Sequence, residues 1–382
     1  MTNINAGTIL STVESDTRDL RVTWADGHVS RFHHIWLRDN CRCPSCLHVQ
    51  TRERIHDTYG IDPNIRPEAV SITDEGHQLS LTWPDGHQTD LPGNWLRLRC
   101  YSEAAREERR VRPTLWGSEI LKNLPEVQAG DALETDEGLQ DFIQKIRDYG
   151  LAVVRNLDCT EGMVEKLAGR ISYLRQTNYG VGFDVESKPD PNNVAYTAIE
   201  LKAHTDLANW ESPPGIQFLH CLDNSAEGGE SVLVDGFAAA EMLRQRDPEA
   251  FRLLSEVELP FRFIDKHWDL RWHAPTISLS LQGDFREIRY HAALCAPFDL
   301  PHDLVEPVYA ALRSFTQILR DPAHEIRLKM GPGDVIVFHN RRVLHGRSAF
   351  DPNSGRRKLQ GCYVDCDDAW SRLRVLKGEN TN

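Results

Sequence analysis

The sequence lacks the features that mark several large classes of protein. None of its 382 residues belongs to an apolar run approaching the about 18 uninterrupted residues that a membrane-spanning helix needs. Its opening residues, MTNINAGTILSTVESDTRD, carry no basic patch followed by an apolar core, as a secretory signal would. Acidic residues outnumber basic ones, with 57 Asp and Glu against 44 Lys and Arg. The resulting formal net charge of −13 disfavours binding to the phosphate backbone of nucleic acids. We therefore expect a cytoplasmic protein that binds neither membranes nor nucleic acid.

Cysteine is present, but its pattern does not indicate a disulfide framework. There are nine cysteines, an odd number, and Cys41, Cys43 and Cys46 crowd into the run CRCPSC. Thiolates are soft ligands, and one further ligand would complete the closed tetrahedron of a structural zinc site. The alternative is a set of free buried thiols in a reducing compartment. The residues offer four candidates for the remaining ligand: His48, His56, His87 and Cys100.

An internal repeat organises the first hundred residues. The run VTWADGH at 22–28, WLR at 36–38 and Cys41 are answered, 59 residues later, by LTWPDGH at 81–87, WLR at 95–97 and Cys100. Each copy alternates apolar and polar residues around a D-G turn, which is typical of a β-hairpin. We predict a small β-rich domain at 1–100. A charged stretch that ends at Pro113 predicts a linker with a helix at 101–134.

The remaining residues, 135–382, predict a mainly β domain with flanking helices. Helical periodicity runs from Leu139 to Ile146 behind a candidate cap at Asp136, with Gly150 as the stop. Further helices are predicted at 160–174 and 304–319. Short β-like runs separated by Gly, Pro and Asn predict a double-sheet sandwich of the jelly-roll type. The predicted strands are 193–197, 216–221, 231–234, 276–281, 326–330, 335–340 and 358–364.

A candidate metal site follows from His204-Thr-Asp206 and the distant His345. Two residues apart on a strand, His204 and Asp206 point to one face, and a His on a facing strand completes the set. Two imidazoles and one carboxylate leave three octahedral positions open, as an Fe(II) oxygenase needs. The basic pair Arg356-Arg357 follows His345, and the residues leave open which of the two grips a carboxylate of a 2-oxo acid.

These motifs resemble the Fe(II)- and 2-oxoglutarate-dependent dioxygenases, and the wider sequence resembles the γ-butyrobetaine hydroxylases. The wider match includes WLRDNCRCPSC at 36–46, NNVAYT at 192–197, PPGIQFLHC at 213–221, VDGF at 234–237 and NRRVLHGR at 340–347. The resemblance implies a double-stranded β-helix domain that binds Fe(II), 2-oxoglutarate and O₂, a structural zinc and a homodimer. It assigns iron to His204, Asp206 and His345, 2-oxoglutarate to Arg357 and Ser231, and zinc to Cys41, Cys43, Cys46 and His87.

The same resemblance implies a pocket for a small zwitterionic substrate. A trimethylammonium group would sit in an aromatic cage of Tyr179, Phe183, Tyr196 and Tyr363, with Asn193 at the carboxylate end. The sequence departs from the family at Ala292 and Cys295, where the relatives carry an amide and an Arg. This departure favours a bulkier anion, with Arg289 and His291 as donors. We therefore expect 2-(trimethylammonio)ethylphosphonate, hydroxylated next to phosphorus, with γ-butyrobetaine and its conversion to carnitine as the alternative.

Two other classes of function remain open from the sequence. A zinc-stabilised adaptor with an inactive β-sandwich would have no need of a complete iron set and Arg357. A taurine- or sulfonate-type oxygenase would keep the iron chemistry without an aromatic cage.

Overall fold

The computed structural model describes residues 6–186 and 198–379, and the chain divides into two compact units, Met1–Val111 and Arg112–Thr381. The stretch predicted as a linker at 101–134 is shared between them. Helix α3 (Glu103–Glu108) belongs to the first unit. Trp116 and Ile120 are buried in a hydrophobic cluster of the second unit, so this stretch is held by side-chain packing.

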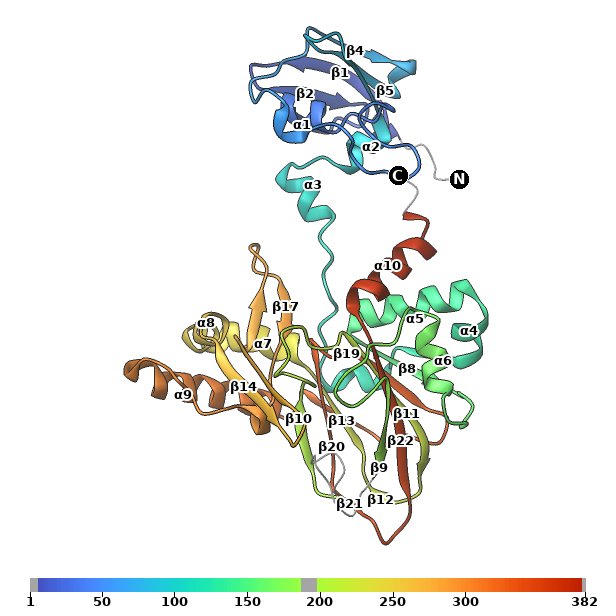
Figure 1. Ribbon diagram of the computed structural model, residues 1–382, viewed down its shortest axis with the longest axis vertical. Helices are drawn as coiled ribbons and strands as arrows, with labels where there is room; N and C mark the ends of the chain where they lie inside the picture. The colour runs from blue at the N-terminus through green and yellow to red at the C-terminus, as the bar shows by residue number, and fades with distance from the viewer. Residues whose placement is uncertain (1–5, 187–197, 380–382) are drawn as a thin grey trace. The chain divides into compact units, whose positions relative to one another are not determined.

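The first unit consists of two three-stranded antiparallel sheets, each followed by a short helix (Figure 1). The hairpins predicted from the repeat are β2–β3 and β5–β6, and each gains one preceding strand. The D-G turns place Gly27 at φ 84° and Gly86 at φ 79°, a conformation that glycine adopts without steric cost. The elements are β1 (Leu10–Ser15), β2 (Asp19–Trp24), β3 (Val29–His33), α1 (His34–Asp39), β4 (Ala69–Thr73), β5 (Gln78–Thr82), β6 (Gln88–Pro92) and α2 (Gly93–Leu98).

The second unit contains two larger sheets, which are antiparallel except for the pair β7–β8. In order, the six-stranded sheet is β7 (Glu126–Gln128), β8 (Leu151–Arg155), β19 (Val335–His339), β11 (Ile216–Asn224), β22 (Arg357–Val364) and β9 (Gly182–Glu186). The four-stranded sheet is β10 (Leu201–His204), β20 (Val343–Arg347), β13 (Ser231–Asp235) and β18 (Glu325–Leu328). Three further pairs are β12 (Glu227–Gly228) with β21 (Phe350–Asp351), β14 (Leu259–Ile264) with β15 (Asp269–Ala274), and β16 (Ile277–Leu279) with β17 (Phe285–Ile288).

Strand alternation in the four-stranded sheet decides which side chains face the other sheet. Leu233 and Val343 pack in one cluster with Phe338 of the six-stranded sheet. Their neighbours Val234 and Leu344 pack in a different cluster, against helices. Because side chains alternate along a strand, residues 231, 345 and 347 share the inner face. The alternation therefore places the side chains of Ser231, His345 and Arg347 between the two sheets.

Helices cover the outer faces of the two sheets (Figure 1). The helices α4, α5, α6 and α10 pack on one side around a core that includes Phe142 and Phe218. The helices α7, α8 and α9 share a core with Phe315. The helix predicted between a cap at Asp136 and a stop at Gly150 is α5, and Gly150 ends it in a left-handed conformation. The predicted cap is wrong by one residue, because the hydroxyl of Thr135 accepts from the nitrogen of Gly138 and Asp136 is already helical. The helices are α4 (Ala129–Glu134), α5 (Asp136–Tyr149), α6 (Met163–Gly169), α7 (Gly236–Arg246), α8 (Pro248–Glu256), α9 (His302–Leu319) and α10 (Cys366–Leu376).

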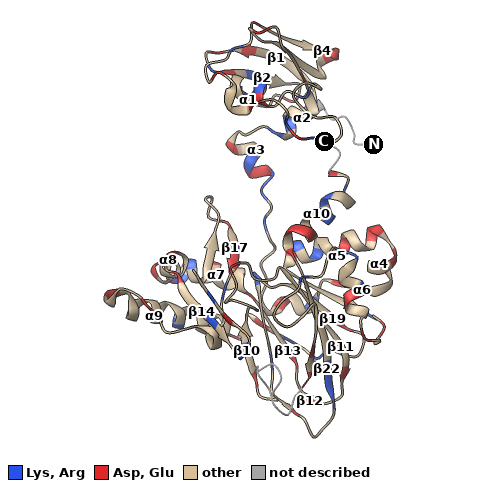
Figure 2. Ribbon diagram, in the orientation of Figure 1, with Lys and Arg blue, Asp and Glu red and all other residues tan. Residues whose placement is uncertain are grey.

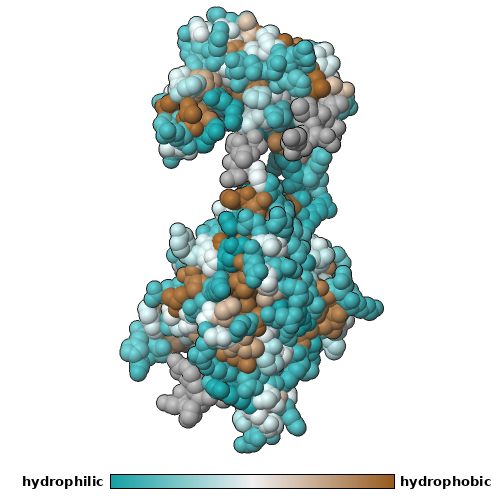
Figure 3. Space-filling model, turned by 90° about the vertical axis from the view of Figure 1, so that its right-hand side faces the viewer, coloured by the Kyte–Doolittle hydropathy of each residue, from teal (hydrophilic) through white to brown (hydrophobic). Residues whose placement is uncertain are grey.

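The charge and hydropathy of the described surface are mixed. Acidic and basic residues are interspersed along both units (Figure 2), and hydrophobic residues form small groups among hydrophilic ones on the face drawn in Figure 3. Among residues 6–186 and 198–379, no helix has the length and apolar character needed to cross a bilayer.

Candidate active site and metal centres

The structure brings His204, Asp206 and His345 together at one point of the second unit. Strands β10 and β20 are paired, with His204 opposite His345. The Nε2 atom of His204 lies 3.3 Å from Oδ1 of Asp206, and Nε2 of His345 lies 3.7 Å from Oδ2. The sequence placed both members of His-x-Asp on a strand, but β10 ends at His204 and Asp206 lies in the following turn. The three ligand atoms nevertheless lie within 4.8 Å of one another.

The surroundings of this triad fix the ligand atoms. Nδ1 of His204 is 2.9 Å from the carbonyl oxygen of Lys202, which leaves Nε2 for a metal. The hydroxyl of Tyr363 donates to Oδ2 of Asp206 at 2.8 Å. Despite burial, the imidazoles of His345 and His204 hold the pKa of Asp206 well below its usual range. Burial lowers the pKa of His345 to about 3. A carboxylate at Asp206 and a neutral imidazole at His345 are the protonation states that bind Fe(II), so the residues fit the ion.

A cavity of about 920 Å³ opens beside the triad and holds two arginines. Arg357 and Arg347 both line it and are 8% and 4% exposed. Burial and the charge of Arg347 lower the pKa of Arg357 to about 10, so both guanidinium groups are still cations at neutral pH. Arg356 instead lies on the surface, where its Nε donates to Glu186 at 3.0 Å. Of the basic pair, the structure brings Arg357 to the cavity.

The predicted hydroxyl at Ser231 also lines the cavity. Ser231 is opposite Arg347 in the pairing of β13 with β20, and it is 6% exposed. Its Oγ lies 3.4 Å from the sulfur of Met330. A hydroxyl and two cations therefore meet in one buried region, which is suited to a carboxylate.

Aromatic side chains line another part of the same cavity. Three of the predicted cage residues are there: Tyr179, Phe183 and Tyr363. The rings of Phe183 and Tyr363 have centroids 5.1 Å apart. Phe263, on β14, adds a fourth ring, 6.3 Å from that of Tyr179. The predicted site residues Asn193 and Tyr196 lie outside the described residues.

The prediction that Arg289 binds an anion is not supported by its position. Arg289 does not line the cavity. It is 4% exposed, its Nε donates to Glu287 at 2.7 Å, and its terminal nitrogens donate to three backbone carbonyls. The carbonyl oxygens belong to Ala208, Trp210 and Glu211. A guanidinium committed to these acceptors supports the chain near the site and is unavailable to a substrate.

The other predicted residues of this region differ in their access to the cavity. His291 and Ala292 line it, whereas Cys295 does not. The ring of His291 lies 4.3 Å from that of His204, centroid to centroid. Burial and the neighbouring His204 lower the pKa of His291 to about 3, so it is neutral and can donate one hydrogen bond.

Sequence reasoning missed many residues that line the cavity, among them Gln217, Phe263 and Arg347. Gln217 is 2% exposed and lies opposite Tyr363 in the pairing of β11 with β22. Strand alternation from His345 would have found Arg347, because it lies two residues further on the same strand. Phe263 carries no comparable signal, since its position depends on how the β14–β15 hairpin packs.

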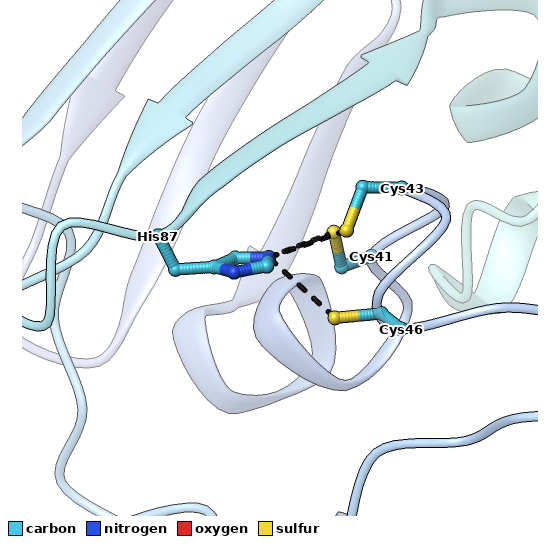
Figure 4. A group of neighbouring side chains, drawn as sticks. All are labelled: Cys41, Cys43, Cys46 and His87. Carbon is cyan, nitrogen blue, oxygen red and sulfur yellow. Dashed lines mark hydrogen bonds between the residues drawn. The ribbon is translucent and has the colours of Figure 1, made fainter.

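A second candidate metal site lies in the first unit (Figure 4). The thiols of Cys41, Cys43 and Cys46 lie 3.3, 3.6 and 3.5 Å from Nε2 of His87. The thiols come from the segment after α1, and His87 comes from the D-G turn of the second repeat. Burial and the nearby Arg38 lower the pKa of His87, so its imidazole is neutral at pH 7. Three thiols around one imidazole nitrogen provide the donor atoms of a closed tetrahedral zinc site.

The other candidates for the fourth ligand are engaged elsewhere. Nδ1 of His48 lies 3.1 Å from the backbone nitrogen of Thr51, and His56 contacts Asp39. Cys100 lies 3.4 Å from His28. The structure thus groups the three clustered thiols with His87.

Comparisons with known proteins identify the family of the chain. Residues 109–363 match the taurine catabolism dioxygenase TauD, TfdA family, and residues 11–75 match the gamma-butyrobetaine hydroxylase-like N-terminal family. The chain belongs to this dioxygenase family. It is 43% identical to gamma-butyrobetaine dioxygenase of Pseudomonas sp. strain AK-1, over 96% of each chain. It is 38% identical to mitochondrial trimethyllysine dioxygenase of Gallus gallus, over 94% of this chain and 86% of the relative.

The fold of the dioxygenase also occurs among solved structures. The crystal structure of AAD-2 in complex with Mn(II) and N-oxalylglycine matches with a TM-score of 0.53 and 13% identity, covering 67% of this chain and 98% of that one. The protein is a γ-butyrobetaine hydroxylase-like Fe(II)- and 2-oxoglutarate-dependent dioxygenase with a mainly β fold and a His-Asp-His iron site. The adaptor hypothesis is therefore wrong.

Proposed function

We propose that this dioxygenase hydroxylates a small trimethylammonium zwitterion, and that its substrate is γ-butyrobetaine, which it converts to carnitine. The observation that carries the proposal is the aromatic lining of the cavity beside the iron ligands. Support also comes from two relatives whose names specify gamma-butyrobetaine and trimethyllysine, both trimethylammonium compounds. The two facing sheets would form the double-stranded β-helix of the family.

Different residues of the site would bind the metal ion and the co-substrate. His204, Asp206 and His345 would hold Fe(II), and Arg357 with Ser231 would hold the distal carboxylate of 2-oxoglutarate. When bound, iron and 2-oxoglutarate supply the conversion of a C–H bond to C–OH by O₂, coupled to the release of succinate and CO₂. The protein binds and orients both ligands and keeps water from the cavity.

The aromatic rings would recognise the cationic end of the substrate. A quaternary ammonium has no N–H to donate, so carboxylates and carbonyls cannot hold it by hydrogen bonds. The faces of Tyr179, Phe183 and Phe263 offer cation–π attraction instead, worth up to about 2 kcal/mol where the cation is desolvated. A taurine- or sulfonate-type substrate would not use these rings.

The carboxylate is favoured over the phosphonate at the other end. The phosphonate hypothesis used Arg289 as a donor, but that guanidinium is fully engaged with Glu287 and backbone carbonyls. His291, which is neutral, still lines the cavity beside Ala292. Because Arg289 is engaged, the phosphonate loses the cationic donor proposed for it, and the relative named gamma-butyrobetaine dioxygenase favours the carboxylate.

The test of this function is substrate-stimulated succinate formation from 2-oxoglutarate with Fe(II), ascorbate and O₂. Four compounds are supplied separately: γ-butyrobetaine, trimethyllysine, 2-(trimethylammonio)ethylphosphonate and taurine. We expect γ-butyrobetaine to give the highest kcat/KM, with carnitine identified by mass spectrometry. A higher kcat/KM with trimethyllysine or the phosphonate would replace the proposed substrate, and turnover of taurine alone would remove the cage from the proposal.

Replacing Phe183 by leucine tests the cage directly. Loss of one ring face is expected to raise the KM for γ-butyrobetaine about 10-fold or more, because about 1.4 kcal/mol of binding corresponds to a factor of ten. Phe183→Tyr retains the ring and should keep KM within about 3-fold. Equal KM values for the leucine variant and the native protein would show that Phe183 does not contact the cation.

We further propose that the Cys41, Cys43, Cys46 and His87 cluster holds a structural zinc ion. Four protein ligands leave no open position, so the ion would stabilise the first unit without a catalytic role. His87→Ala is expected to reduce zinc from about one per chain to near zero and to lower the melting temperature, because metal binding is coupled to folding. The matched control is His48→Ala, an exposed His two residues after Cys46, which should retain full zinc. Retention of zinc in both variants would contradict the assignment.

A further inference from the structure

The two halves of the first unit repeat one another residue by residue in three dimensions. The 59-residue offset relates β2, β3 and α1 to β5, β6 and α2. The buried indoles repeat the same hydrogen bond. Nε1 of Trp24 donates to Oγ of Ser30 at 2.9 Å, and Nε1 of Trp83 donates to Oγ1 of Thr89, also at 2.9 Å. The offset therefore identifies structurally equivalent positions.

Side chains of each half reach across to the other in matching pairs. Arg97 of the second half binds Asp26 of the first at 3.0 Å, and the equivalent Arg38 lies 3.9 Å from Asp85 of the second. Such reciprocity is expected of two copies related by approximate two-fold symmetry. The metal cluster obeys the same rule, because its thiols come from the first half and His87 comes from the second.

The reciprocal pair of the metal cluster is His28 with Cys100. These residues occupy the positions equivalent to His87 and Cys41. Nε2 of His28 lies 3.4 Å from Sγ of Cys100, close to the 3.3 Å that separates His87 from Cys41. With Zn–S near 2.3 Å and Zn–N near 2.0 Å, tetrahedral geometry places the two atoms about 3.5 Å apart. Half of a tetrahedral site is therefore preserved.

The two remaining ligand positions of the second copy carry no thiol. The positions equivalent to Cys43 and Cys46 hold Ser102 and Ala105. One backbone hydrogen bond is shared: the nitrogen of Leu47 donates to the carbonyl of Cys43 at 2.9 Å, and the nitrogen of Arg106 donates to that of Ser102 at 2.9 Å. The two segments then differ, because Ser102 caps helix α3 through its hydroxyl, whereas Cys43 begins a turn.

The environment of these positions is also preserved. Ala105 is 6% exposed, as against 2% for Cys46, and the hydroxyl of Ser102 lies 3.3 Å from the sulfur of Cys100. Although burial opposes it, hydrogen bonds with Ser102 and Ser30 lower the pKa of Cys100.

We infer that the first unit contains a second, latent metal site centred on Cys100 and His28, which needs only two thiolates, at positions 102 and 105, to bind a tetrahedral zinc ion. In the native chain two protein ligands and a hydroxyl are too few for tight zinc binding, so zinc occupies the complete cluster alone. The Cys100–His28 contact remains as a packing contact between the halves. This inference does not depend on the proposed substrate.

The test is the zinc content of the full-length double variant Ser102→Cys/Ala105→Cys, measured by mass spectrometry after removal of loosely bound metal. We expect one zinc per chain more than the native protein, whatever the native content. Cobalt substitution should add a second set of tetrahedral thiolate absorption bands. Adding His28→Ala to the double variant should cancel the increment, because it removes the fourth ligand.

A second variant keeps the inference testable if the double variant does not fold. Ser102→Cys alone exchanges oxygen for sulfur and supplies a third protein ligand, so it should bind one additional Cd²⁺ that the native chain does not bind. A folded double variant without additional zinc would overturn the inference. So would an increment that survives His28→Ala, since the added thiols would then bind metal without the imidazole.

Discussion

The Asp206→Ala variant is expected to lose its iron and at least 10³-fold of its turnover. Asp206 supplies the one anionic ligand of the triad, and its two oxygens face one imidazole each, at 3.3 Å from His204 and 3.7 Å from His345. Without it, two neutral imidazoles remain, which is too few ligands to retain Fe(II) against water. A 10³-fold loss corresponds to about 4 kcal/mol of transition-state stabilisation.

The variant should remain folded, because the turn that carries Asp206 is held through its backbone. The side-chain oxygen of Asn340 accepts a hydrogen bond from the nitrogen of Asp206 at 2.7 Å, and the amide of Asn340 donates to its carbonyl at 3.1 Å. Both bonds are independent of the carboxylate. Iron content and succinate formation are measured together, with Asp141→Ala, an exposed acid on α5, as the control. Iron retention with more than a tenth of native activity would exclude Asp206 as a ligand.

The sequence predicted the structure best where a short motif or a regular hydrophobic pattern was present. His-x-Asp identified His204 and Asp206 because each residue type is specific for the chemistry, although the strand ends between them. The exact spacing of the repeat predicted both hairpins of the first unit, because a D-G turn fixes the register of a hairpin. The helix at 136–149 combined apolar periodicity with a glycine stop, and the structure confirms it.

Other features depend on tertiary packing, which no local pattern records. The helix predicted at 160–174 is only Met163–Gly169, since Gly162 takes a left-handed conformation just before it. Arg289 was interpreted as an anion donor from its charge alone, but its neighbours in space, Ala208 to Glu211, are about eighty residues away in sequence. Phe263 reaches the cavity from a hairpin that sequence reasoning did not predict.

Replacing Arg357 by glutamine is expected to raise the KM for 2-oxoglutarate by about 100-fold or more. The guanidinium is 8% exposed, with its Nε 3.3 Å from the carbonyl of Gly229, and the nearby charge of Arg347 contributes to lowering its pKa. An incoming carboxylate relieves this repulsion and forms charge-assisted hydrogen bonds in a desolvated site. Truncating one partner of such a buried pair costs about 3 kcal/mol or more, which corresponds to a factor above 100.

The neighbouring arginine provides a matched control for this prediction. Arg356→Gln removes the same charge one residue away, from an exposed side chain paired with Glu186, and should leave the KM for 2-oxoglutarate within about 2-fold. Iron content should be native in both variants, because neither arginine contacts the triad. The free Arg357→Gln protein should be at least as stable as the native chain, since the substitution removes a desolvated charge repelled by Arg347. A similar KM for both variants would mean that another group, with Arg347 the first candidate, holds the co-substrate.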